Sequence, residues 1–202
     1  MRFGDDNQKT IYILLTYTGS LLSKVIKKYI KCDYTHVSLS LDIDLTELYS
    51  FGRLRPTNPF FAGFVKEDIK NGTYAYFTNT KCCLYSIDVD IEQYNRLKEW
   101  IHRFRLEKDK YSYNLIGFLG VIINRPIYRR YSYFCSQFVA YILEQSGIKL
   151  FDKHPALVTP YDFQTNPRLN KIYEGRLMEY NPISISFEQG GLYNKIKKGE
   201  VG

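Results

Sequence analysis

The first half of the chain places apolar and polar residues at the spacing of β-strands. Residues 11–17 form a β-branched and aromatic run that is typical of a buried strand, and residues 35–41 alternate strictly between apolar and polar. The pattern further predicts a turn over 42–44, a returning strand over 46–51, a long loop with two prolines over 54–72, and strands over 73–77 and 82–89.

Helical spacing dominates the second half. Residues 91–106 and 134–145 repeat apolar positions three and four apart, and residues 114–124 are apolar nearly all round, which predicts a buried helix. Thr159 followed by a proline predicts the start of a short helix. The remaining predicted elements are a lysine-rich amphipathic helix over 21–31 and two short strands over 172–174 and 176–180.

Strands in one half and helices in the other favour an α+β fold in which an antiparallel sheet packs against helices. The length of 202 residues suits one domain, which we expect to span residues 1–188. Residues 189–202 are polar and rich in glycine and lysine, so we expect a flexible tail there.

Charge and composition bear on the partners. The chain has a formal net charge of +7, and 16% of its residues are aromatic, a combination that also occurs in nucleic-acid-binding proteins. Here, however, the basic residues are spread along the chain and form no Arg-rich block or known nucleic-acid motif. We therefore expect no nucleic-acid partner.

Two observations bear on location. The longest apolar run, residues 115–123, is far shorter than the roughly 20 residues that a helix needs to span a bilayer. Residues 1–10 contain neither the apolar segment nor the cleavage site of a secretory signal. We therefore expect a cytoplasmic protein with no transmembrane segment.

Cys135 differs from the other three cysteines by its position. The apolar stripe of residues 138–143 places the start of a helix close to it. A helix N-terminus carries about half a positive charge and unpaired N–H groups, which stabilise a thiolate and can hold an oxyanion. No cysteines have CxxC spacing, so we expect no metal site. A buried, inert thiol remains the alternative for Cys135.

A thiolate nucleophile needs an imidazole beside it. His36 is the best candidate, because strand alternation places it with Ser38 and Ser40 on the face opposite the apolar residues. His102 lies on a predicted helix surface, and His154 lies in a loop and stays open as an alternative. Counting across the predicted hairpin places Ser50 on the face of His36, where it would orient the imidazole.

The segments Thr35-His36-Val37 and Phe134-Cys135-Ser136-Gln137-Phe138-Val139 resemble the permuted NlpC/papain-like group of YiiX-like proteins. His36 precedes Cys135 by 99 residues, the order of the circularly permuted members. The resemblance covers about residues 11–162 and implies a circularly permuted papain-like (NlpC-type) fold.

The resemblance also implies a cysteine amidase or peptidase acting on a small peptide or amide, without a cofactor. Cys135 aligns with the nucleophile and His36 with the base. YiiX-like relatives often have Glu as the third member of the triad, where this chain has Ser50; Glu47 is nearby but on the opposite face. On the same grounds, Tyr17 and Thr18 would contact substrate.

Two other functions stay open. Lecithin retinol acyltransferase-like proteins share the permuted order, so a lipid acyltransferase is one alternative. The other is a non-catalytic, basic binding module that retained the same scaffold.

Overall fold

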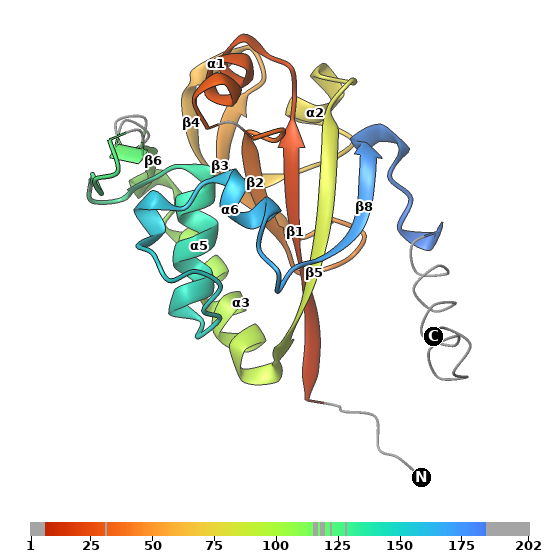
Figure 1. Cartoon of the computed structure of the whole chain (residues 1–202), viewed down its shortest axis with the longest axis vertical. Helices are drawn as coiled ribbons and strands as arrows, with labels where there is room; N and C mark the ends of the chain where they lie inside the picture. The colour runs from red at the N-terminus through yellow and green to blue at the C-terminus, as the bar shows by residue number, and fades with distance from the viewer. Residues whose placement is uncertain are drawn as a thin grey trace.

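A six-stranded antiparallel sheet forms the centre of the computed structural model, which describes residues 7–30, 32–114, 117, 120–121, 123–127 and 129–184 (Figure 1). The order of its strands is β4-β3-β2-β1-β5-β8. Their bounds are Gln8–Tyr17 for β1, His36–Ser40 for β2, Leu48–Arg55 for β3, Asn58–Glu67 for β4, Lys81–Asp90 for β5 and Asn170–Arg176 for β8. The strands β6 (Ser112–Tyr113) and β7 (Ser132–Tyr133) form a separate parallel pair.

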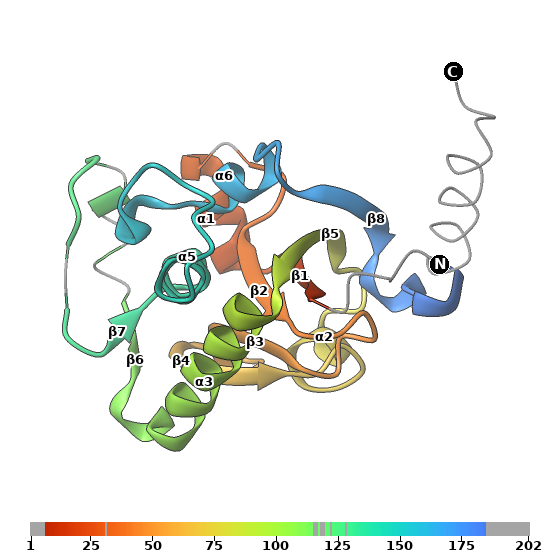
Figure 2. The ribbon, with the colours of Figure 1, turned by 90° about the horizontal axis from the view of Figure 1, so that it is seen from below.

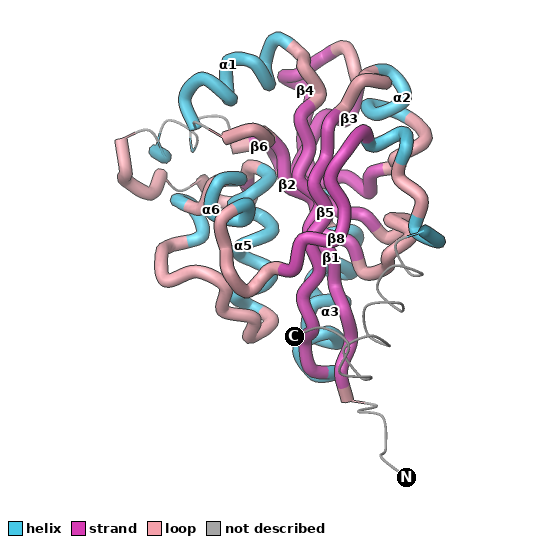
Figure 3. Tube along the Cα trace, turned by 45° about the vertical axis from the view of Figure 1, so that its right-hand side comes forward, coloured by secondary structure: helices cyan, strands magenta, loops and turns pink. Residues whose placement is uncertain are grey.

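Two of the helices pack side by side against one face of the sheet, as Figure 2 shows for α3 and α5. Figure 3 shows α2 on the other side of the strands from α5 and α6. The helices are α1 (Leu21–Ile30), α2 (Gly72–Tyr76), α3 (Ile91–Leu106), α5 (Cys135–Gln145) and α6 (Pro160–Gln164), with short 3₁₀ helices at Lys108–Lys110, Pro155–Leu157 and Leu177–Glu179.

The two faces of the sheet bury different sets of side chains. On the face of α3 and α5, the main core includes Leu15, Leu39 and Phe51 with Phe138 of α5. A smaller apolar cluster on the opposite face includes Leu14, Leu48, Leu84, Tyr74 and Leu177. Because strand side chains alternate, β1, β3 and β5 each contribute to both clusters.

The predicted α+β architecture with an antiparallel sheet is confirmed. Strand alternation and helical periodicity correctly located β1, β2, β5, α1, α3 and α5, and the Thr159 cap with its proline located α6. The strand predicted over 46–51 begins at Leu48 and continues to Arg55 as β3.

Three sequence predictions are wrong. Residues 54–72 contain β4, which pairs with β3 across a tight turn at Pro56 and Thr57, rather than a long loop. Residues 73–77 belong mostly to α2, because Asp68 Oδ1 accepts the N–H groups of Lys70 and Asn71 and turns the chain out of the sheet. The two short terminal strands are one strand, β8, followed by a 3₁₀ helix.

The helix predicted over 114–124 falls partly outside the described residues, and the tail predicted over 189–202 lies wholly outside them. Within the described part of the chain, none of the helices is long and apolar enough to cross a membrane.

Candidate active site

Cys135 is the first residue of α5, and the first turn of this helix is held from two sides. Phe134 precedes it in an extended conformation and provides no side-chain cap. Gln137 Oε1 accepts the Phe134 N–H at 3.4 Å, and Ser136 Oγ donates to the Val158 carbonyl oxygen at 2.7 Å. The helix start is therefore fixed without a capping side chain in front of the thiol.

The pKa of Cys135 is lowered even though the residue is only 5% exposed. Burial raises the pKa of a thiol, because it disfavours the charged form. The charge of His36 and a hydrogen bond to its ring outweigh the burial, and the backbone N–H groups of Val37 and Ser136 add to the effect. Cys135 therefore forms a thiolate at lower pH than an ordinary cysteine does.

The imidazole of His36 connects this thiol to a carboxylate. Its Nε2 lies 2.8 Å from Glu67 Oε1, which leaves Nδ1 to hydrogen-bond the sulfur of Cys135. Burial lowers the pKa of His36, but the negative charges of Glu67 and Cys135 have the larger effect in the opposite direction. The pKa of the imidazole is therefore raised to about 10. At neutral pH the ring is thus an imidazolium that donates to both neighbours.

Glu67, the last residue of β4, accepts hydrogen bonds from four side chains. Its Oε1 accepts from His36 and from Ser50 Oγ at 2.7 Å, and its Oε2 accepts from Ser38 Oγ at 2.6 Å and Tyr74 OH at 3.0 Å. Burial raises the pKa of this carboxyl group, but His36 and the two serine hydroxyls lower it more. The carboxylate is therefore ionised and fixed in place.

The position assigned to Ser50 at the imidazole is held by Glu67. Strand alternation correctly placed Ser50 on the face of His36, but its hydroxyl donates to the carboxylate and so acts on the ring through Glu67. Glu47 lies elsewhere on the hairpin, where its carboxylate bonds Lys66 and Tyr49.

Glu67 was missed because Pro56 and Pro59 made its segment look like a loop. The signal that could have found it is the run of apolar residues over 60–65, which is separated from a Pro-Thr turn by two residues and is followed by a carboxylate at position 67. Pro59 is compatible with β4 because this strand lies at the edge of the sheet.

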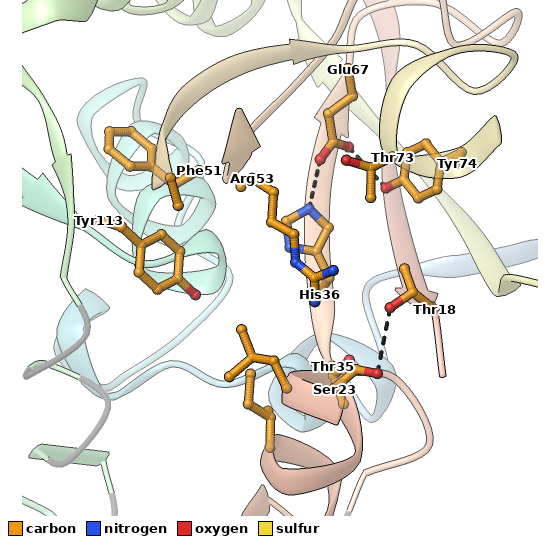
Figure 4. Close-up of a pocket in the computed structure, with 14 residues that line it drawn as sticks. Thr18, Ser23, Thr35, His36, Phe51, Arg53, Glu67, Thr73, Tyr74 and Tyr113 are labelled. Carbon is orange, nitrogen blue, oxygen red and sulfur yellow. Dashed lines mark hydrogen bonds and ion pairs between the residues drawn. The ribbon is translucent and has the colours of Figure 1, made fainter. Parts of the chain in front are cut away.

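A cleft encloses about 600 Å³ of space, part of it open to solvent, beside the imidazole (Figure 4). His36, Glu67 and Tyr74 line it together with Arg53 of β3 and Tyr113 of β6. A smaller crevice of about 300 Å³ lies on the side of the thiol, and Cys135, Phe134, Ile26 and Pro160 are among its lining residues.

The glycine at position 52 leaves room for the ring. A Cβ on Gly52 would lie 3.3 Å from Glu67 Oε1 and Ser50 Oγ, and 3.4 Å from His36 Cε1. Contacts this close would push against the pair that His36 and Glu67 form.

Tyr113 lines the same crevice as Cys135, and its hydroxyl interacts with the thiol. Burial and the charge of Cys135 hold the pKa of this phenol well above its usual range, so it keeps its proton at neutral pH. Tyr113 therefore places an O–H donor next to the thiolate.

The other predicted site residues lie at different distances from this centre. Thr18 lines the cleft, whereas Tyr17 packs against the main core with Lys27 Nζ 5.0 Å from its ring centroid. His102 is exposed on α3, and His154 Nδ1 accepts the Ala156 N–H at 3.0 Å. In the described part of the chain, no three His, Cys, Asp or Glu side chains gather as metal ligands would.

Comparison with known proteins adds no family to these observations: the chain matches no family model, no curated protein and no solved structure.

Proposed function

We propose that this protein is a cysteine hydrolase that cleaves amide bonds through Cys135, His36 and Glu67. The observation that carries the proposal is the hydrogen-bonded series of thiol, imidazole and carboxylate, in which the pKa of the thiol is lowered and that of the imidazole is raised. Such an ion pair is the activated form of a cysteine nucleophile.

The order of the site residues supports a circularly permuted papain-like fold of the NlpC type. The histidine strand β2 precedes the cysteine helix α5 in the chain, and the helix packs against an antiparallel sheet. The resemblance described above rests on the same two segments.

The reaction would start with attack of the Cys135 thiolate on the substrate carbonyl carbon, which forms the C–S bond. The Cys135 backbone N–H at the start of α5 and the Tyr113 hydroxyl would hold the oxyanion. The His36 Nδ1–H would then give its proton to the leaving amine nitrogen as the C–N bond breaks.

The resulting thioester would be resolved by water. Neutral His36 takes a proton from the water molecule as its oxygen attacks the carbonyl carbon, and the C–S bond breaks to release the acid and the thiolate. Glu67 stabilises the imidazolium in both half-reactions and keeps its ring in one orientation.

A trapping experiment tests this proposal. The protein is incubated with p-nitrophenyl acetate, and mass spectrometry locates the acetyl group. We expect a hydroxylamine-sensitive acetyl thioester on Cys135, which Cys135→Ser cannot form and His36→Ala forms far more slowly. His102→Ala is the matched control, because His102 is exposed on α3, and it should acetylate at the wild-type rate.

The same experiment separates the alternatives. Release of acetate supports a hydrolase, whereas preferential transfer to an added alcohol or amine would indicate an acyltransferase. A Cys135 that acquires no acetyl group, in a chain that binds RNA or anionic vesicles in a salt-sensitive way, would contradict the proposal and favour a binding module.

A further inference from the structure

Arg53 points to the kind of substrate that the cleft accepts. It lies on β3 and lines the same cleft as His36 and Glu67 (Figure 4). Its Nη2 donates to Ser20 Oγ at 2.6 Å and its Nη1 to the Pro56 carbonyl oxygen at 3.4 Å. Only two of the five N–H donors of the guanidinium are accounted for by these bonds.

No carboxylate pairs with Arg53 among the described residues. Burial lowers the pKa of its guanidinium. The carboxylate of Glu67 lines the same cleft, but it already accepts four hydrogen bonds. A half-buried guanidinium without a counter-ion is costly to desolvate, and an anion in the cleft would offset that cost.

The location of Arg53 identifies the part of the substrate that would carry the anion. The leaving amine must lie on the side of His36, because this residue supplies its proton. His36 and Arg53 line one cleft, whereas Cys135 opens into the other crevice, where Phe134 and Pro160 offer apolar surface. The acyl group would therefore lie in the apolar crevice, and the amine part would lie beside Arg53.

We propose that Arg53 binds a carboxylate on the amine part of the substrate, so that the preferred substrates are amides of amino acids with a free carboxylate. This inference rests on the proposed function. The planar guanidinium matches a carboxylate with two parallel hydrogen bonds, which a lysine cannot make. Ser20 Oγ accepts a hydrogen bond from the guanidinium, and Ser20 is itself hydrogen-bonded to Thr18 and Ser23.

Paired alkylating reagents test this inference without knowledge of the natural substrate. N-iodoacetylglycine carries a carboxylate, and N-iodoacetylglycinamide is its neutral counterpart. Each alkylates a thiolate by forming an S–C bond and releasing iodide. The measured quantity is the ratio of the two rate constants at Cys135, followed by mass spectrometry and divided by the same ratio for 2-mercaptoethanol.

We expect the wild-type protein to favour the anionic reagent by about tenfold, the size of one charge-assisted hydrogen bond. Arg53→Gln should remove this preference, and Arg53→Lys should keep part of it because the charge remains without the planar fork. Arg55→Gln is the matched control: Arg55 lies on the same strand, exposed and stacked over Phe61, and its loss should leave the preference unchanged.

Several outcomes would overturn the inference. Equal rates for the two reagents in the wild type would exclude an anion site. If Arg53→Gln and Arg55→Gln lose the preference for the anionic reagent to the same extent, that preference comes from the net charge of the protein. Circular dichroism checks that each variant folds. If Arg53→Gln does not fold, the test rests on Arg53→Lys, and a preference for the anionic reagent as large as that of the wild type would overturn the inference. A Cys135 that reacts with neither reagent contradicts the proposed function itself.

Discussion

Cys135 and Cys82 are both buried cysteines, with 5% and 0% of their surfaces exposed, yet their pKa values move in opposite directions. Cys82 lies in β5 within the smaller apolar cluster, where burial raises its pKa to about 12. Burial acts in the same direction on Cys135, but the imidazolium of His36 and two backbone N–H groups reverse its effect. The charged and polar neighbours, rather than the degree of burial, therefore separate a nucleophile from a packing residue.

The largest expected effect is the difference in reactivity between these two cysteines. At pH 7, we expect Cys135 to react with iodoacetamide at least about a hundredfold faster than Cys82, because each pKa unit changes the thiolate fraction tenfold and lower nucleophilicity offsets only part of the gain. Cys83 and Cys32, whose pKa values are also raised by burial, should react slowly as well. Competitive labelling of the folded protein, read by mass spectrometry, measures all four.

The next effect concerns the carboxylate. Glu67→Gln removes the charge that raises the pKa of His36, so the imidazolium becomes less stable and the pKa of Cys135 should rise. Labelling at pH 6 should then slow by about tenfold. Glu47→Gln is the matched control, since Glu47 lies on the same hairpin but bonds Lys66. Equal slowing in both variants would show that Glu67 has no specific role.

A smaller effect is expected at Ser50. Ser50→Ala removes one of the four donors to Glu67, so the unfolding free energy should fall by about 1 kcal/mol and labelling at pH 6 should slow only a few-fold. Ser40→Ala is the control, because this buried hydroxyl donates to the Asp42 carbonyl oxygen instead. Thermal unfolding and labelling rates measure both effects. If Ser50→Ala slowed the labelling of Cys135 as much as Glu67→Gln does, the expected order of the two effects would be wrong.

Sequence reasoning located the parts of the site that depend on local periodicity. The alternation over residues 35–41 placed His36 and Ser38 on one face, and the apolar stripe of residues 138–143 placed the start of a helix at Cys135. Both features follow from the backbone geometry of a single element, which a short stretch of sequence is enough to reveal.

The rest of the site depends on contacts between elements. Glu67 reaches His36 because β4 folds back on β3, and Tyr74 reaches Glu67 because a short helix, rather than a strand, follows β4. Prolines at positions 56 and 59 suggested a loop, although one lies in the turn and the other in an edge strand. Pairing between β3 and β4 overrode the local signal of the prolines, whereas the hydrogen bonds accepted by Asp68 Oδ1 turn the chain toward α2.

The measurement that tests the central claim most directly is the pH dependence of Cys135 alkylation in the wild type, His36→Ala and the control His102→Ala. We expect the wild-type and His102→Ala rates to fall only at a pH well below about 8.5, the ordinary pKa of a cysteine. In His36→Ala the burial of Cys135 is no longer offset, so the midpoint should move above that value. An unchanged midpoint in His36→Ala would contradict the account, because Cys135 would then owe its reactivity to something other than the imidazolium.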